Sequence, residues 1–73
     1  MSNYRTAIIY CTQDQVNGKR FLKYRNIKDD QHSLEKFKRF ARKFPGAWYV
    51  NWYDKLTKNY IGRDYLKQNR AGR

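Results

Sequence analysis

An aromatic stretch over residues 48–66 constrains the fold more than any other part of this chain. It holds two tryptophans and four tyrosines, and its first half alternates with the two-residue period of a β-strand. Trp48, Val50 and Trp52 share one side of such a strand, which predicts a face toward the core. The intervening side chains then point the other way, and they are Tyr49, Asn51 and Tyr53.

A return strand is predicted over residues 60–66, after a polar loop over residues 54–59. Alternation places Ile61, Arg63 and Tyr65 on one face of this strand, and Tyr60 and Leu66 on the other. The sequence does not fix the register between the two strands, so which set joins the tryptophan face stays open. Together the two strands predict a β-hairpin.

A basic amphipathic segment precedes this hairpin and predicts a helix over residues 34–44. Its apolar side chains recur at three- and four-residue steps and form one stripe, made of Leu34, Phe37, Phe40, Ala41 and Phe44. Ser33 is the expected N-cap, and carboxylates at Asp29 and Asp30 favour the positive end of the helix dipole. Pro45 and Gly46 are expected to end the helix. We expect the stripe to pack on the tryptophan face of the sheet.

The first third of the chain predicts a second hairpin. Residues 4–12 are rich in β-branched and aromatic side chains, and the run from Ala7 to Cys11 is apolar on both faces, which favours a central strand. Asn17 and Gly18 favour a turn with positive φ. A further strand is expected over residues 19–27, with Leu22 turned toward the core.

The predicted fold class is α+β, a small single domain with the order β-β-α-β-β and one helix packed on a mostly antiparallel sheet. The domain is expected over residues 1–66, followed by a flexible basic C-terminal tail over residues 67–73. A chain of 73 residues has a small core, and its one cysteine, Cys11, permits no intrachain disulfide. A dense aromatic core or association of two copies would compensate, so both a monomer and a homodimer are open.

Patterns of catalysis and metal binding are not evident in the sequence. The six acidic residues are scattered, and we expect Asp54 to form a turn and Asp64 a surface ion pair. No Cys/His cluster has metal-ligand spacing, and no glycine-rich loop suits a phosphate. We therefore expect a non-enzymatic protein with no metal and no cofactor. A cytoplasmic location without membrane contact is expected, because no run approaches the ~20 apolar residues of a membrane span and no signal-peptide pattern is present.

The charge balance indicates a polyanionic partner. Seventeen Lys and Arg residues oppose six acids, and the formal net charge is +11 at pH 7. Such a surface attracts nucleic acid, with DNA slightly favoured over RNA. The alternative is a protein-interaction module whose basic surface meets an acidic protein partner.

Two surfaces combine the charges that such a partner requires. The sheet face away from the tryptophans would offer cations and rings for unpaired bases, through Lys23, Arg25, Tyr49, Tyr53, Arg63 and Tyr65. The exposed side of the helix would offer cations for a phosphate backbone, through Lys36, Arg39, Arg42 and Lys43. Strand propensity alone could also account for the tyrosines, and an ordinary solvated helix face could account for the helix cations.

The segment from Gly46 to Asp54, followed by a lysine-containing turn, resembles the sheet hairpins of small DNA-binding modules attached to integrases. The resemblance covers about twenty residues and implies a hairpin that contacts DNA. In those modules the helix follows the sheet, whereas here it precedes the hairpin. The small size and basic charge also resemble the accessory proteins of phages and mobile elements, which implies an acidic host protein as the alternative partner.

Overall fold

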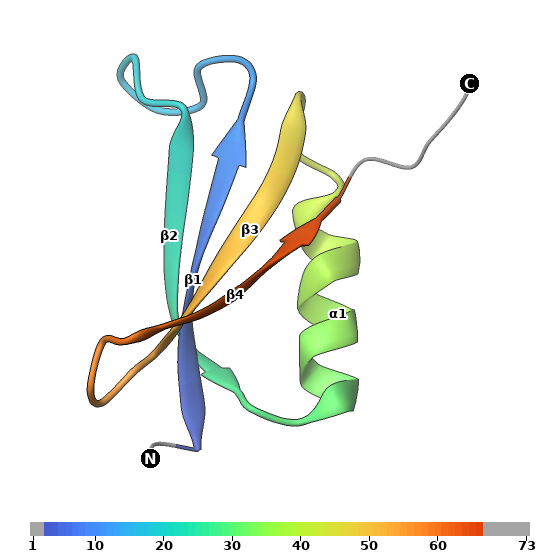
Figure 1. The fold of residues 1–73 in the computed structure, drawn as a ribbon. Helices are drawn as coiled ribbons and strands as arrows, with labels where there is room; N and C mark the ends of the chain where they lie inside the picture. The colour runs from blue at the N-terminus through green and yellow to red at the C-terminus, as the bar shows by residue number, and fades with distance from the viewer. Residues whose placement is uncertain (1–2, 67–73) are drawn as a thin grey trace.

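Four strands and one helix follow each other in the predicted order β-β-α-β-β (Figure 1). This computed structural model describes residues 3–66, and the tail predicted over residues 67–73 lies outside them. The elements are β1 (Tyr4–Cys11), β2 (Phe21–Lys28), α1 (Gln31–Ala41), β3 (Ala47–Asp54) and β4 (Tyr60–Tyr65). The predicted α+β fold class is confirmed.

The four strands form one antiparallel sheet in the order β2-β1-β3-β4. The strand β1 is central, as its apolar pattern on both faces predicted. Asn17 and Gly18 have φ values of 49° and 79°, so the predicted positive-φ turn between β1 and β2 is also confirmed. Two hairpins thus join along β1 and β3, and α1 connects them on one side of the sheet (Figure 1).

The core lies between α1 and the sheet face that it covers, here called the covered face. Ile9 of β1 and Val50 of β3 are fully buried there, and Trp52 is 1% exposed. Phe37 of α1 meets Trp52 edge-on, with 5.6 Å between the ring centroids. The predicted packing of the helix stripe on Trp52 is therefore observed, and burial of these large apolar side chains stabilises the short helix.

The helix is shifted by one turn from its predicted position. Asp30, rather than Ser33, is the N-cap, because its carboxylate Oδ1 accepts the backbone N–H of Ser33 at 2.8 Å. An aspartate at this position caps as well as a serine, which explains the earlier start. Phe40 was expected inside, but it is 40% exposed and contacts Tyr24 of the outer strand β2 at the margin of the core.

Each pair of neighbouring strands contains one register shift, and two of these shifts redirect aromatic side chains. Trp48 is the extra residue between the pairs Tyr10–Tyr49 and Cys11–Ala47, and it is 45% exposed. The prediction that Trp48 lies on the core face is therefore wrong. An extra residue in one strand re-aims its side chain, and here the Trp48 ring lies against Tyr49 instead.

Gly46 is required where the chain turns from α1 into β3. Its φ is +71°, a left-handed conformation that side-chain-bearing residues rarely adopt. A Cβ at this position would lie 2.6 Å from Oγ1 of Thr12, so the position also lacks room. The carbonyl of Gly46 accepts the backbone N–H of Thr12, which fixes the start of β3 against the end of β1.

Candidate functional site: the open face of the sheet

The sheet face opposite α1, here called the open face, collects alternate side chains from all four strands. Register places Tyr10 of β1 beside Tyr49 of β3, and Asn51 of β3 between Ile8 and Arg63. The face comprises Phe21, Lys23 and Arg25 of β2, Thr6, Ile8 and Tyr10 of β1, Tyr49, Asn51 and Tyr53 of β3, and Tyr60, Arg63 and Tyr65 of β4. All six sheet residues that the sequence predicted as a binding surface are therefore on one face.

Aromatic rings on the two central strands form the middle of this face. The rings of Tyr10 and Tyr49 are stacked, with centroids 5.0 Å apart and planes inclined by 26°. Tyr65 and Trp48 both meet the ring of Tyr49, and they are 59% and 45% exposed. Partial burial raises the pKa of the Tyr10 hydroxyl above its usual value. The ring surface that a planar ligand can reach is therefore that of Tyr65 and Trp48, at the margin of this group.

The guanidinium of Arg63 lies over this aromatic group. Its guanidinium carbon is 4.1 Å from the centroid of the Tyr49 ring. Its Nε donates to Oδ1 of Asn51 at 2.8 Å, and its Nη1 donates to the hydroxyl of Tyr65 at 3.3 Å. The bond to Tyr65 helps to raise the pKa of Arg63 above its usual value. The buried amide of Asn51 thus orients a permanently charged group that keeps further N–H donors for a ligand.

At the other end of the open face, cations surround a hollow of ≈ 190 Å³. Lys23 and Arg25 reach it from β2, Lys58 reaches it from the β3–β4 turn, and Tyr53 forms part of its wall. We call this feature the cationic hollow. Its residues are Thr6, Ile8, Lys23, Arg25, Tyr53, Asp54 and Lys58.

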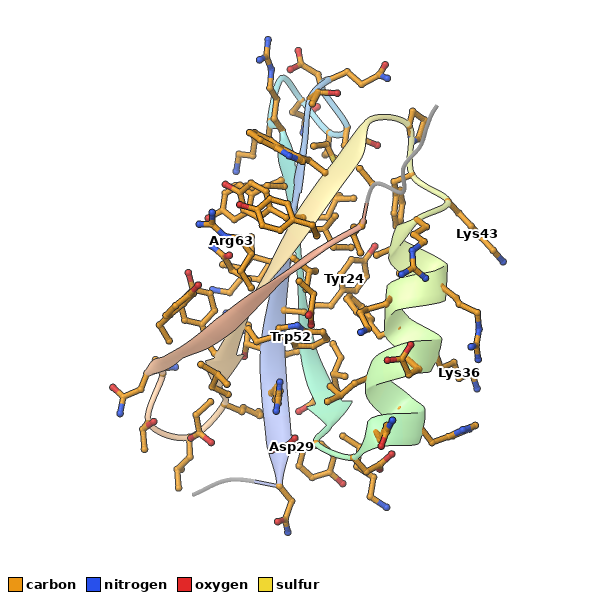
Figure 2. The ribbon with its side chains drawn as sticks, turned by 45° about the vertical axis from the view of Figure 1, so that its right-hand side comes forward. Tyr24, Asp29, Lys36, Lys43, Trp52 and Arg63 are labelled. Atoms are coloured by element: carbon orange, nitrogen blue, oxygen red, sulfur yellow. The ribbon has the colours of Figure 1, made fainter. Side chains whose placement is uncertain are left out.

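The four predicted helix cations lie elsewhere. Lys36 and Lys43 project from α1 on the side of the molecule away from Arg63 (Figure 2). Arg42 is partly used by the fold, because its Nε donates to the backbone carbonyl of Leu66 at 3.3 Å. Lys36, Arg39, Arg42 and Lys43 are all exposed, but the structure does not bring them to the open face. The two predicted surfaces are therefore separate.

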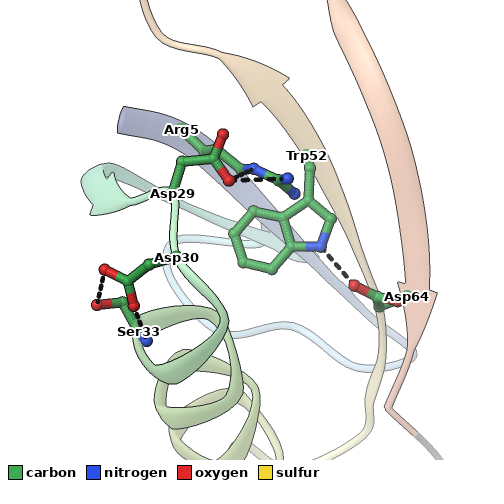
Figure 3. A network of polar contacts seen from close by, with 6 residues as sticks. All are labelled: Arg5, Asp29, Asp30, Ser33, Trp52 and Asp64. Atoms are coloured by element: carbon green, nitrogen blue, oxygen red, sulfur yellow. Dashed lines mark hydrogen bonds and ion pairs between the residues drawn. The ribbon is translucent and has the colours of Figure 1, made fainter. Parts of the chain in front are cut away.

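The acidic side chains serve the fold. Asp29 pairs with Arg5 at 3.0 Å, and Asp64 accepts the indole N–H of Trp52 at 2.7 Å (Figure 3). Asp64 therefore binds a core side chain, and the expected surface ion pair is wrong. Asp54 forms the predicted turn by accepting the backbone N–H of Thr57 at 2.8 Å. Residues 3–66 contain no group of three or more His, Cys, Asp and Glu side chains placed to hold a metal ion.

Several residues of the open face were missed by the sequence argument. Tyr10 was assigned to a strand apolar on both faces, and only its register with Tyr49 shows which side it serves. Tyr60 was expected beside Leu66, but the shift between Trp52 and Tyr53 places it against Tyr53, with ring centroids 5.7 Å apart. Local alternation misplaces these side chains because an extra residue in a strand has no clear signature in the sequence.

Comparison with known proteins gives no match to a family model, to a curated protein or to a solved structure. Within the described part of the chain, no helix combines the length and the apolar surface needed to cross a bilayer. The argument for function therefore depends on the geometry and chemistry of the open face.

Proposed function

We propose that this protein binds nucleic acid without catalysing a reaction, and that its open face receives an unpaired strand. The supporting observation is the stacked pair Tyr10 and Tyr49 on the central strands, flanked by cations on both outer strands. Lys23 and Arg25 stand on β2, and Arg63 stands on β4 over the Tyr49 ring. Rings in the centre suit bases, and cations at the margins suit the phosphates that connect them.

Stacking supplies contact energy that does not depend on base identity. Each base stacked on an aromatic side chain contributes ~1–3 kcal/mol to binding. Tyr65 and Tyr60 are 59% and 56% exposed, so ring surface is available without rearrangement of the fold. A duplex keeps its base faces covered, so these rings favour a single strand over a double helix.

The cations make the binding depend on salt. Each phosphate neutralised by Lys or Arg releases condensed counterions, so the logarithm of the affinity falls linearly with the logarithm of the salt concentration. The helix cations, among them Lys36 and Arg39, contribute to the long-range attraction of a polyanion, and the open face makes the contacts. DNA is the first ligand to test, with RNA of the same sequence beside it.

The test is fluorescence anisotropy of a labelled, mixed-sequence single-stranded DNA at several salt concentrations. We expect Tyr65→Leu to weaken binding by ~1–3 kcal/mol through loss of stacking at an unchanged net charge, because the Tyr65 ring is 59% exposed. Arg63→Gln and Lys36→Gln remove the same charge from opposite sides of the molecule. We expect Arg63→Gln to lower the affinity several-fold more than Lys36→Gln, because only Arg63 lies among the rings.

Two results would contradict the proposal. One is the absence of wild-type binding to single strands at low salt. The other is equal loss of affinity in Arg63→Gln and Lys36→Gln, which would indicate a charge effect spread over the whole surface. Circular dichroism of each variant shows whether the fold is intact, since both cations are exposed.

An acidic protein partner is the second candidate, favoured by exposed apolar side chains away from the stacked rings. Leu56 in the β3–β4 turn is 71% exposed, and Ile61 of β4 is 41% exposed. Neither side chain has an evident use with nucleic acid, whereas apolar and aromatic anchors are common in protein interfaces. A stoichiometric partner that survives nuclease treatment in a pull-down, together with no binding to oligonucleotides, would support this candidate.

A further inference from the structure

The cationic hollow lies where the open face ends, beside the start of β1, the end of β3 and the β3–β4 turn. Its volume of ≈ 190 Å³ is below the ~300–1,000 Å³ of pockets that enclose a drug-sized ligand. The hollow therefore suits a group of a few heavy atoms rather than a base with its sugar. Tyr53 forms one wall and lies on the same strand and face as Tyr49.

The charges around the hollow favour an anion. Among residues 3–66, ion pairs hold Arg5, Arg20 and Lys38, but none holds the three cations of the hollow. These three are Lys23, Arg25 and Lys58. An excess of cations around one space raises the affinity of that space for an anion.

One carboxylate, that of Asp54, also lines the hollow, and it is committed to the turn. Its Oδ2 accepts the backbone N–H groups of Leu56 and Thr57 at 3.1 and 2.8 Å, and the residue is 5% exposed. The three cations therefore outnumber one carboxylate whose Oδ2 is already engaged in these hydrogen bonds. The hydroxyl of Thr6 adds a neutral donor to the lining.

The turn that carries Lys58 is fixed on two sides. The backbone N–H of Lys58 donates to the carbonyl of Asp54 at 2.8 Å, and Lys58 itself has a left-handed φ of 68°. Nζ of Lys55 donates to Oδ1 of Asn26, which ties the turn to the irregular end of β2. The backbone position of Lys58 relative to β2 is thus fixed before any ligand arrives, so binding does not require the turn to be ordered.

We propose that the cationic hollow binds the terminal monophosphate of a nucleic-acid strand, with the terminal base against Tyr53. A terminal phosphate monoester carries about −1.5 to −2 charges at pH 7, more than an internal diester, and so matches several cations better. A strand that follows β3 from Tyr49 to Tyr53 reaches the hollow, because Tyr53 lies on the same face as Tyr49 and lines the hollow. This inference rests on the proposed binding of a strand to the open face.

The experiment compares three DNA oligonucleotides of one sequence, with a 5′-phosphate, a 3′-phosphate or no terminal phosphate. The label is internal, and the affinities are measured by anisotropy at one salt concentration. We expect one of the two phosphorylated forms to bind about tenfold more tightly than the unphosphorylated strand, as hydrogen bonds to a charged group imply. The preference should shrink below about pH 6, where the second phosphate proton binds.

Arg25→Gln and Arg39→Gln form the matched pair of variants, because each removes one exposed arginine charge, from the hollow and from the helix respectively. We expect Arg25→Gln to abolish the preference for a terminal phosphate and Arg39→Gln to retain it. Equal affinities of the wild type for all three oligonucleotides would overturn the inference and leave the proposed function intact. A preference that survives in Arg25→Gln would overturn it too, because the phosphate would then bind elsewhere.

Failure of the proposed function is recognised separately, by the absence of binding to every oligonucleotide. Inorganic phosphate alone is then titrated into the protein, and the chemical shifts of the backbone amides are monitored by NMR. Saturable shifts at Thr6 and Lys58 that are lost in Arg25→Gln would support a phosphate site. The absence of such shifts would overturn it.

Discussion

The two faces of one sheet carry aromatic side chains for different purposes. On the covered face Trp52 is 1% exposed and its indole N–H is bound by Asp64. On the open face Tyr65 is 59% exposed and its hydroxyl accepts from Arg63. Both faces are built from the same strands. Within β3, five consecutive positions include Trp52 on the covered face and both Tyr49 and Tyr53 on the open face. Aromatic content alone therefore does not distinguish a core from a binding surface.

One ring contact of the open face differs from those of the covered face, although the other rings of the open face are tilted or edge-on, as Tyr49 and Tyr65 are at 63°. Rings on the covered face meet edge to face, as Phe37 and Trp52 do at 64°, which is typical of a close-packed core. On the open face Tyr10 and Tyr49 lie nearly parallel at 26°, with Arg63 above the Tyr49 ring. The exposed rings of the open face, Tyr65 at 59% and Tyr60 at 56%, offer surface on which a base can stack, whereas Trp52 at 1% offers none.

Truncation of one ring on each face gives the largest test of this comparison. We expect Trp52→Ala to lower the free energy of unfolding by ~3–5 kcal/mol, because it removes a buried indole and leaves a cavity. We expect Tyr49→Ala to cost about 1 kcal/mol, the typical effect of a point mutation, because its ring is only half-buried. Urea denaturation followed by circular dichroism measures both values.

Trp52→Phe keeps the test measurable if Trp52→Ala does not fold. This variant retains an aromatic ring and leaves Asp64 without the indole donor, so a smaller loss of ~1–3 kcal/mol is expected. A loss of about 3 kcal/mol or more in Tyr49→Ala, as large as that for a buried ring, would mean that the open face also belongs to the core. The distinction between the faces would then be wrong.

Sequence alternation predicted the open face as far as the strands stay regular. Tyr49 and Tyr53 were assigned to the outer face from the spacing of Trp52 and Val50, and the register then brought Arg63 to the same side. The prediction failed at Trp48, because Trp48 is itself the extra residue at the edge of the regular region, and alternation does not give the side of an unpaired residue. Such an insertion depends on pairing with a strand distant in sequence, so local spacing cannot reveal it.

The helix shows a second limit of the sequence argument. The apolar stripe identified the packed side of the helix. It could not show that Phe37 is more deeply buried than Phe40, which lies at the margin of the core beside Tyr24 of the edge strand β2. The cationic hollow was also missed as a unit, since Lys58 comes from a turn more than thirty positions after Lys23 and Arg25. Residues that meet only through tertiary structure leave no periodic trace in the sequence.

Substitution of Gly46 tests whether the turn between α1 and β3 fixes the start of β3. Its expected effect on the free energy of unfolding is smaller than that of Trp52→Ala. We expect Gly46→Ala to cost about 1–2 kcal/mol from the left-handed backbone alone, and more from the 2.6 Å approach to Thr12. Gly62→Ala is the control, because a Cβ there meets nothing within 4 Å. A Gly46→Ala variant as stable as Gly62→Ala in urea would show that this turn does not constrain the start of β3.

Acid should lower the stability of the folded state through the N-cap of α1, the helix that packs on the covered face. This is the smallest of the expected effects. The backbone N–H of Ser33 donates to Asp30 and lowers the pKa of its carboxyl, so the ionised form stabilises the folded state. This contribution is complete above the unfolded-state pKa of about 3.9 and is lost as pH falls through the lower folded-state value. We expect the melting temperature to fall below about pH 4, and to fall less steeply in Asp30→Asn, which caps without titrating.

Asp14→Asn is the control, because Asp14 lies in an exposed ion pair with Arg20 far from the helix. If the melting temperature of Asp30→Asn falls as steeply in acid as that of the wild type and of Asp14→Asn, the helix cap does not contribute to the pH dependence of stability.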